Sequence, residues 1–418
     1  MARLLYSLLL YLLLPLILLR LAYRSWRAPD YRRRVAERFG FFAPPARTGG
    51  LWVHAVSVGE SIAAAPLIER FLNQYPQLPV VVTTMTPTGS ERVRAMFGDR
   101  VFHVYAPYDL PGAVARFLKR IRPCALVIME TEIWPNMVCQ TRGRGVPVVL
   151  ANARLSARSA RGYGRVSALT GAVFSKLSMV AAQSRDDAER FAALGVAADA
   201  LDVTGSIKFD ISLSEAQRQQ ATRWRRDLGE RPIWIAASTH EGEDDILLSA
   251  HTALRKQQPE ALLILVPRHP ERFDSVAALV RQHELSLARR SREESAAEAA
   301  VLLGDTMGEL VTLFGCADLA FIGGSLVERG GHNSLEAAAW GLPIITGPSD
   351  FNFAEISRQL QEAGGLRQCS PSALAAELVA LMGDDGRRTE MGRAASQVVE
   401  SNRGALERLC GIVDRRLG

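Results

Sequence analysis

Cysteine is scarce in this chain, and the spacings that disulfide or metal sites need are missing. The 418 residues contain five cysteines, an odd and scattered set without a CxxC or Cys/His spacing. We therefore expect neither a disulfide framework nor a structural zinc site, and we expect the protein to reside in a reducing compartment. With 48% hydrophobic and 22% charged residues, the composition excludes a disordered, collagenous or polytopic membrane protein. The length predicts two or three domains.

Several catalytic fingerprints are also absent. No GxGxxG follows the first apolar run, so a dinucleotide cofactor has no sequence basis, and no Walker A lysine loop occurs. The chain lacks GxSxG and HExxH, and it lacks the DxD pair that a metal-dependent sugar-nucleotide enzyme would use. We therefore expect neither a cofactor nor a metal.

Positive charge is concentrated at one end of the chain. Residues 1–38 hold eight arginines against Asp30 and Glu37, an excess equal to the formal net charge of +6. The rest of the sequence is balanced. A nucleic-acid-binding protein is expected to carry its positive charge on a folded face, so no nucleic-acid partner is expected here.

The same end contains an uncharged apolar run, LLYSLLLYLLLPLILL, over residues 4–19. This run spans about 24 Å as a helix, less than the ~30 Å hydrocarbon core, so it crosses a bilayer only marginally or lies partly in the interface. Arg20 and Arg24 follow where a cleaved signal peptide has small residues, which favours a retained anchor over residues 1–27. A buried core helix is the other alternative. The positive-inside rule places the body in the cytoplasm, with the arginines near anionic lipid headgroups.

Beyond residue 45, short apolar runs alternate with helical stretches such as 61–74 and 112–121. This alternation predicts an α/β fold with parallel, doubly wound sheets. A polar stretch near residue 210 divides the body into two similar halves, 28–210 and 211–418, which we expect to face a cleft that binds ligands at the carboxyl ends of the strands. Strands are predicted at 51–56, 80–84, 101–105, 125–129, 148–151 and 179–182, and then at 233–237, 261–266, 299–303, 319–322 and 343–346.

Three residues of the first half are candidates for chemistry. Glu60 follows the first strand in the motif SVGES, where a carboxylate can serve as general base or simply complement the helix dipole. Glu130 follows another strand in METEIWPN, where desolvating two carboxylates is costly without a function. Alternatively, one of them caps the next helix and the other is solvated. Lys208, in GSIKFD at the domain junction, is either solvated or available to neutralise phosphate charge.

The second half contains four loops that suit a phosphorylated ligand. Arg268 closes a strand in VPRHP and is suited to bidentate phosphate contact. The loop DTMGEL at 305–310 follows another strand and begins a helix. Glycine-rich turns at 323–324 and 330–331 let the backbone approach a ligand, and Glu336 can accept hydrogen bonds from a ribose diol. Each loop alone is also explained as an ordinary glycine turn, with Asn333 or Ser334 capping a helix. Together they predict metal-free group transfer from a nucleotide-activated donor.

These motifs carry a family resemblance. The sequence resembles the bacterial 3-deoxy-D-manno-oct-2-ulosonic acid (Kdo) transferases of lipopolysaccharide synthesis, whose lipid acceptor is lipid IVA. The resemblance covers nearly the whole chain. It rests on the amino-terminal anchor and on HAVSVGE at 54–60, TTMTPTG at 83–89, METEIWPN at 129–136, GSIKFD at 205–210, VPRHPERF at 266–273 and GGHNSLEAAAWGLP at 330–343.

The resemblance implies a GT-B glycosyltransferase with two Rossmann-like domains on the cytoplasmic face of the inner membrane. It would transfer Kdo from CMP-Kdo to lipid IVA with inversion, and no obligate protein partner is evident. Glu60 would accept the proton, and Glu130 and Lys208 would stabilise the transition state. The residues that would hold CMP are Pro267, Arg268, Met307, Gly308, Glu309, Asn333, Ser334, Leu335 and Glu336.

Two other functions stay open on the residues alone. A related two-domain enzyme using a UDP-sugar, as transferase or epimerase, would share the α/β pattern. A non-catalytic scaffold that binds lipid or nucleotide is the second alternative, although carboxylates clustered at strand ends argue against it.

Overall fold

The computed structural model describes residues 1–417 and divides into two compact units. Unit 1 comprises Met1–Asp210 and Arg403–Gly418, and unit 2 comprises Ile211–Asn402. The sequence pattern placed everything after residue 210 in the second domain, and for the C-terminal segment this was wrong. Helix α17 (Ala405–Asp414) belongs to unit 1 because its buried apolar side chains, Leu409 and Ile412 among them, join one of that unit's cores.

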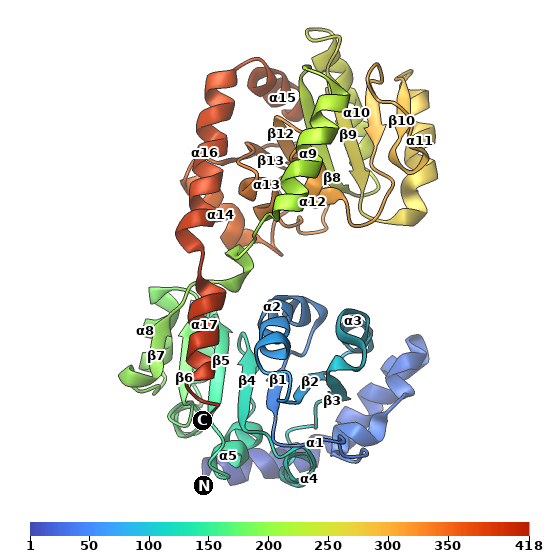
Figure 1. Ribbon diagram of the computed structural model, residues 1–418. Helices are drawn as coiled ribbons and strands as arrows, with labels where there is room; N and C mark the ends of the chain where they lie inside the picture. Colours follow the sequence, from blue (N-terminus) through green and yellow to red (C-terminus); the bar gives the residue numbers. More distant parts are fainter. Residues whose placement is uncertain (418) are drawn as a thin grey trace. The chain divides into compact units, whose positions relative to one another are not determined.

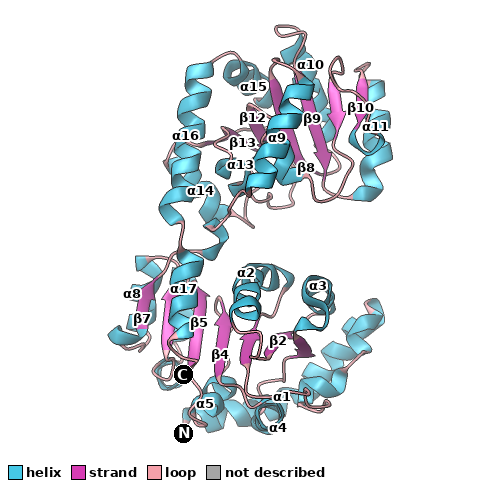
Figure 2. Ribbon diagram, viewed as in Figure 1, coloured by secondary structure: helices cyan, strands magenta, loops and turns pink. Residues whose placement is uncertain are grey.

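Unit 1 is built on a seven-stranded parallel sheet of order β3-β2-β1-β4-β5-β6-β7 (Figures 1 and 2). Strand β1 lies between β2 and β4, with Leu51 opposite both Val80 and Ala125. The chain therefore reverses its direction of winding between β1 and β4. The strands are β1 (Leu51–His54), β2 (Val80–Thr84), β3 (Phe102–Tyr105), β4 (Ala125–Met129), β5 (Val148–Ala153), β6 (Met179–Ala182) and β7 (Leu201–Val203).

Helices cover both faces of this sheet, as a doubly wound fold requires. Alternate side chains of the strands enter two separate cores, so Val53 packs in one and Trp52 in the other. The longer helices are α1 (Ala2–Arg27), α2 (Val58–Gln74), α3 (Pro87–Phe97), α4 (Pro111–Ile121), α5 (Pro135–Arg142), α6 (Ala157–Gly164), α7 (Ser167–Phe174) and α8 (Arg185–Ala193).

Unit 2 repeats this architecture with a parallel sheet of order β10-β11-β9-β8-β12-β13-β14. Its winding reverses between β8 and β12. The strands are β8 (Ile233–Thr239), β9 (Leu262–Pro267), β10 (Leu287–Arg289), β11 (Val301–Leu303), β12 (Leu319–Ile322), β13 (Ile344–Thr346) and β14 (Leu366–Gln368). The helices are α9 (Glu215–Leu228), α10 (Asp244–Arg255), α11 (Phe273–Gln282), α12 (Leu310–Phe314), α13 (Leu335–Ala339), α14 (Ala354–Glu362), α15 (Leu374–Met382) and α16 (Asp385–Asn402).

The predicted doubly wound α/β fold is confirmed, but three strands were missed. These are β7, β10 and β14, each three residues long and placed at an edge of its sheet. Edge strands pack against fewer neighbours, and β7 and β14 are accordingly half-buried or exposed over most of their length. They therefore lack the continuous apolar run that revealed the central strands.

Helix α1 is long and apolar enough to cross a membrane, by length and composition. It continues through Pro15 without interruption and exposes most of its leucines. Two η-helices, η1 (Pro29–Arg32) and η2 (Val35–Phe39), lead from it to β1.

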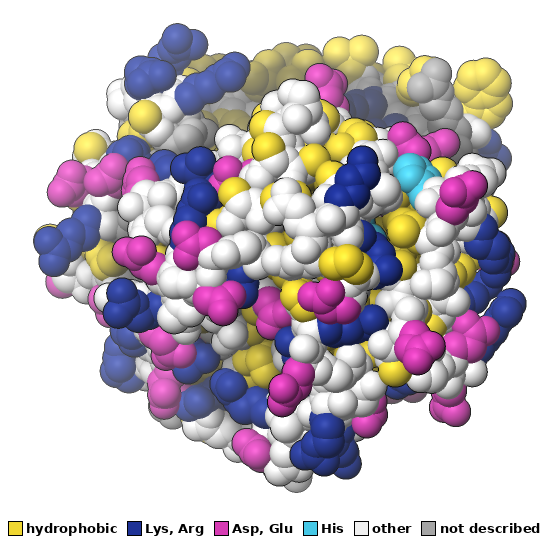
Figure 3. Space-filling model, turned by 90° about the horizontal axis from the view of Figure 1, so that it is seen from above, with side chains coloured by type: hydrophobic (Ala, Val, Ile, Leu, Met, Phe, Trp, Pro, Cys, Tyr) yellow, Lys and Arg dark blue, Asp and Glu magenta, His cyan; other side chains and the backbone are white. Residues whose placement is uncertain are grey.

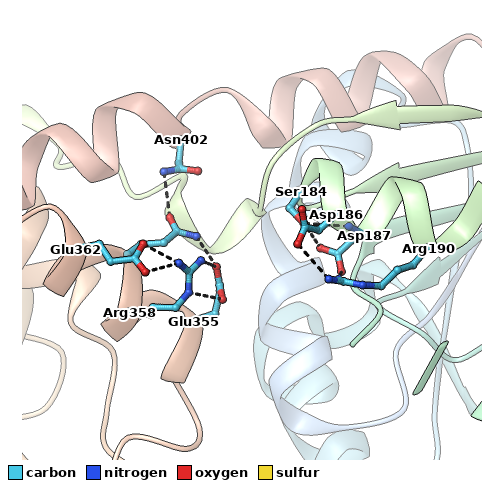
Figure 4. A network of polar contacts seen from close by, with 9 residues as sticks. Ser184, Asp186, Asp187, Arg190, Glu355, Arg358, Glu362 and Asn402 are labelled. Atoms are coloured by element: carbon cyan, nitrogen blue, oxygen red, sulfur yellow. Dashed lines mark hydrogen bonds and ion pairs between the residues drawn. The ribbon is translucent and has the colours of Figure 1, made fainter. Parts of the chain in front are cut away.

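Charges on the surface of the body are mixed in sign. On the face shown in Figure 3, basic and acidic side chains alternate over short distances. Two helices carry local ion-pair networks (Figure 4): Arg358 bridges Glu355 and Glu362 on α14, and Arg190 contacts Asp186 on α8. Exposed pairs at this spacing contribute at most about 1 kcal/mol each, so the fold depends on its cores instead.

The placement of α17 can be tested by a core substitution. Leu409→Ala removes a fully buried side chain from unit 1, and we expect it to lower the free energy of unfolding by about 2–4 kcal/mol. Urea unfolding followed by circular dichroism measures the change. Glu407→Ala, an exposed position on the same helix, is the matched control and should change stability by less than about 0.5 kcal/mol. Equal effects from the two variants would contradict the packing of α17.

Candidate functional site

In unit 1 the reversal between β1 and β4 brings two predicted site residues to the same edge of the sheet. Parallel strands end at one edge, and ligands of doubly wound folds bind where the winding reverses. The loop after β1 leads to Glu60, in the first turn of α2, and Glu130 directly follows β4. Sequence reasoning placed both residues at strand ends. The strand order shows that these two ends are neighbours.

Glu60 is held by the turn that starts α2. The Ser57 hydroxyl accepts a hydrogen bond from the Glu60 N–H (3.3 Å), and it donates to Glu60 Oε1 (2.8 Å). Glu60 Oε2 accepts from the Val56 N–H (2.8 Å), and 8% of the residue remains exposed. The carboxylate is therefore fixed in direction within a largely buried residue.

Burial raises the pKa of Glu60 to about 7, and this effect outweighs the hydrogen bonds from Ser57 and Val56. The negative charges of Glu132 and Glu130 raise it further. A carboxyl group with a pKa near neutrality exchanges protons readily at physiological pH, which is the property a general base needs.

Glu130 and Lys208 form an ion pair, with 3.3 Å between Nζ and Oε1. Both side chains are partly exposed, at 39% for Lys208 and 29% for Glu130. Glu130 has a left-handed backbone, with φ of 55°, which is uncommon for a residue with a side chain. Such conformations cost about 1–3 kcal/mol and concentrate at functional sites. Asn152, also left-handed and fully buried, holds the Lys208 turn by accepting from the Ile207 N–H (3.2 Å).

The structure adds one carboxylate that the sequence reasoning did not select. Glu132 accepts a hydrogen bond from the indole N–H of Trp134 (3.1 Å), and it lies close enough to affect the pKa of Glu60. The Trp134 ring in turn packs edge-on against His54, with 4.9 Å between ring centroids. The doubled glutamates of the METEIWPN motif were the available signal, but spacing alone did not show which of them faces Glu60.

In unit 2, Arg268 and Glu336 are brought together with a group of histidines. Burial raises the pKa of Glu336, and the nearby Arg268 charge offsets part of that rise. His240 and His332 stack, with 2.9 Å between their Nε2 atoms, and His269 meets His240 edge-on. Burial, together with the charges of His240, Arg268 and His269, lowers the pKa of His332 to about 4. Within residues 1–417 no group of three or more His, Cys, Asp or Glu side chains is placed to hold a metal ion.

Glu243 corrects one expectation for this unit. The turn after β12 was expected to offer its backbone to a ligand, but the fully buried Glu243 carboxylate fills it. This carboxylate accepts hydrogen bonds from the N–H groups of Gly324 (2.7 Å), Ser325 (3.0 Å) and Leu326 (2.9 Å), and also from His240 (2.8 Å). Glu243 thus ties the end of β8 to the end of β12. The turn is a structural joint, which no motif in the sequence indicates.

The other predicted CMP residues differ in exposure and in hydrogen bonding. The Glu309 carboxylate binds the Arg290 guanidinium through two hydrogen bonds of 3.1 Å. Met307 is 68% exposed, and Gly308 has a left-handed φ of 85°. Asn333 Oδ1 accepts from the Leu335 N–H (3.1 Å), which is the local capping role that the sequence left open. Pro267 and Ser334 are buried. The Met307–Glu309 segment follows β11, which pairs with β9, the strand that ends just before Arg268.

The two units together define a glycosyltransferase of the GT-B type, with two Rossmann-like parallel sheets. A model of the family described as 3-deoxy-D-manno-octulosonic-acid transferase (kdotransferase) matches residues 33–211, and a model of glycosyl transferases group 1 matches residues 230–398. Among solved structures, Acinetobacter baumannii MurG aligns with a TM-score of 0.57 at 14% identity, over 88% of this chain and 100% of that one. At that identity the likeness concerns the fold alone.

Full-length relatives identify the family. A 3-deoxy-D-manno-octulosonic acid transferase of Haemophilus influenzae is 46% identical over 99% of this chain and 98% of its own. One of Bordetella pertussis is 38% identical over the whole of both chains. This chain belongs to the 3-deoxy-D-manno-octulosonic acid transferase family.

The raised pKa of Glu60 predicts a pH-dependent change in stability. Between its ordinary pKa near 4.5 and its folded pKa of about 7, the folded state retains a proton that the unfolded chain has lost. Glu60 therefore destabilises the fold increasingly as pH rises through this window, and Glu60→Gln removes that cost. We expect the stability of Glu60→Gln relative to wild type to increase by about 2–3 kcal/mol from pH 5 to pH 8.5.

Urea unfolding of both proteins at the two pH values tests this expectation, because other titrating groups cancel in the difference. Glu69→Gln on the same helix is the control. The Arg100 guanidinium lowers the pKa of Glu69 through a hydrogen bond, so its substitution should show no such increase. A difference between Glu60→Gln and wild type that is independent of pH would contradict the raised pKa.

Proposed function

We propose that this protein transfers Kdo from CMP-Kdo to a hydroxyl of lipid IVA in lipopolysaccharide synthesis, with inversion and without a metal. Family membership supports the Kdo transfer, because the relatives in Haemophilus and Bordetella carry that name over full-length matches. The observation that carries the catalytic assignment is Glu60, a fixed and largely buried carboxylate with a pKa of about 7 at the reversal point of unit 1.

The proposed reaction is a single displacement. The acceptor hydroxyl oxygen bonds to the anomeric carbon of Kdo, while the bond from that carbon to the phosphate oxygen of CMP breaks. Glu60 takes the hydroxyl proton, and CMP leaves with the bonding electrons. Lys208, oriented by Glu130, lies on the same sheet edge and is assigned to stabilise the negative charge that develops on the departing phosphate.

Donor binding is assigned to unit 2. Arg268 presents an exposed guanidinium beside Glu336, a pair suited to the phosphate and the ribose diol of CMP respectively. Pro267, the segment Met307–Glu309 and the segment Asn333–Leu335 are assigned as the remaining nucleotide contacts. The donor held by unit 2 and the base of unit 1 must then act on one acceptor hydroxyl.

We also place the protein at the inner membrane. Helix α1 exposes a run of leucines that aqueous surroundings would not favour, and Arg20 and Arg24 follow this run. Attachment through α1, with both catalytic units on the cytoplasmic side, would keep the enzyme close to a lipid acceptor. Neither a nucleic acid nor an obligate protein partner is part of the proposal.

Glu60→Gln tests the base. The amide keeps the shape of the side chain but cannot accept the proton, so we expect the transfer rate to fall by about 10²- to 10⁴-fold while CMP-Kdo binding is unchanged. The wild-type rate should rise with pH up to about 7 and then level off, because the base must be ionised. Rates are measured by mass spectrometry of the lipid product, with Glu69→Gln as control. Near-normal turnover by Glu60→Gln would refute the assignment.

Arg268→Ala tests the donor site. Loss of a charge-assisted phosphate contact is expected to weaken CMP binding about 10- to 100-fold, as measured by isothermal titration calorimetry. Arg281→Ala, an exposed arginine on α11, should bind CMP normally. Titration with UDP in parallel separates the proposed donor from a UDP-sugar. Tighter binding of UDP than of CMP would favour the related UDP-sugar enzyme.

A further inference from the structure

Helix α1 has an unusual distribution of side chains for a helix that contacts a folded domain. It is 26 residues long, and the only side chains described as buried along it are two serines, Ser7 and Ser25. Leucines occupy the exposed surface, and the largest exposures include Leu4 (71%), Leu12 (69%) and Leu19 (65%). A surface helix in water has the reverse arrangement, with its apolar stripe facing the core. The exposed surface of α1 therefore requires an apolar medium.

The amino-terminal end of α1 is bonded to the body of unit 1. The Tyr6 hydroxyl donates a hydrogen bond to Asp109 Oδ2 (3.0 Å), and the Asn136 side-chain amide donates to Ser7 Oγ (3.0 Å). Asp109 and Asn136 are themselves buried, at 8% and 2% exposure. Asp109 also accepts from the N–H groups of Asn136 (2.9 Å) and Met137 (2.7 Å) in the first turn of α5. These contacts are long-range and polar, and we call them the α1 lock.

The chain that leaves the other end of α1 is also bonded to unit 1. After η1, the Arg34 guanidinium donates to the His103 carbonyl (3.0 Å), and Glu37 accepts from the Tyr105 N–H (2.9 Å). Both contacts are to β3. The start of α1 and the segment that follows it are thus attached to the same body.

This attachment is incompatible with a helix that crosses a bilayer. A helix of 26 residues is about 39 Å long, and a spanning helix separates its ends by a hydrocarbon core of ~30 Å. The body follows the carboxyl end of α1, so spanning would carry Tyr6 to the opposite side of the membrane. Tyr6 then could not reach Asp109. The α1 lock and a spanning α1 are mutually exclusive.

We propose that α1 lies in the plane of one membrane leaflet, held there by the α1 lock, with its leucine surface among the acyl chains and both of its ends on the side of the body. This inference concerns the geometry of attachment and rests on the proposed association with a lipid surface. In-plane helices sit about 5–10 Å deep, at the boundary of headgroups and acyl chains. Tyr11, Tyr23 and Trp26 are exposed on α1, and such side chains favour that boundary.

The side of the membrane on which the amino terminus lies decides between the two geometries. A short protease-cleavable tag is placed before Met1 of the full chain, or after Gly418 in a second version. Cleavage is then compared in inverted inner-membrane vesicles and in spheroplasts. We expect both tags to be cleaved in inverted vesicles and neither in spheroplasts. Cleavage of the two tags from opposite sides would overturn the inference. Recovery of the protein outside the membrane fraction would instead overturn the proposed membrane association.

The α1 lock is tested by a variant that leaves every leucine in place. Tyr6→Phe combined with Ser7→Ala removes the hydrogen bonds that Tyr6 and Ser7 make with Asp109 and Asn136, and the protein should still sediment with membranes. We expect backbone hydrogen exchange in the first turns of α1 to increase about tenfold, measured by mass spectrometry on protein in liposomes. Tyr11→Phe, an exposed tyrosine on the same helix, is the matched control. Equal exchange in the double variant and the control would overturn the role of the lock.

Discussion

The parallel pairing of β1 with β4, and of β8 with β12, is the constraint on which the candidate site depends. In unit 1 the register places His54 opposite Ile128, so the two strands end within a residue of each other at one edge. In unit 2 Ile322, the last residue of β12, lies opposite Ala237, and β8 ends two residues later at Thr239. Glu60 and Glu130 therefore come to the same edge of the sheet without a long loop. The order of the strands in the sheet brings these residues to one edge, and hydrogen bonds of the side chains then fix their orientation.

Each unit has a glutamate near the point where its winding reverses. The two glutamates differ in the number of hydrogen bonds that they accept. Glu243 accepts four backbone hydrogen bonds and is fully buried, and burial raises its pKa despite these bonds. Glu60 accepts two hydrogen bonds and faces two further carboxylates. The hydrogen bonds to Glu243 join the ends of two strands. Glu60 keeps a carboxyl group whose pKa is close to neutral pH. Burial alone would not distinguish the two.

The sequence predicted those parts of the fold whose signal is local. Central strands such as β4 are continuous apolar runs, and the motif SVGES directly after a strand places Glu60 in the first turn of a helix, as α2 shows. Edge strands such as β7 have no such run. The return of α17 to unit 1 depends on contacts with residues several hundred positions earlier, including the hydrogen bond from Tyr75 to Asp414 (3.0 Å), and no local pattern shows such a contact.

The same distinction holds for the site. Glu60 and Glu130 were found because they follow strands, but the left-handed backbone of Glu130 and the turn built on Asn152 are set by tertiary structure. In a single sequence, only a glycine signals a position with positive φ. Where another residue adopts this conformation, the sequence does not reveal it. Glu243 was missed for a related reason, since its four partners are backbone groups and carry no residue identity.

The α1 lock connects membrane attachment to this site through α5. Asp109 accepts hydrogen bonds from the first turn of α5 and from Tyr6, so one carboxylate joins the two helices. The segment between β4 and α5 holds Glu130, Glu132 and Trp134, and it is fixed at both ends: by the Glu130 N–H on the Ala151 carbonyl (2.9 Å) and by the start of α5 on Asp109. A helix that lies in the membrane surface thus shares its attachment point with the loop that carries the carboxylates. An in-plane α1 sets the orientation of that loop relative to the lipid surface, which a flexible spanning tether would not do.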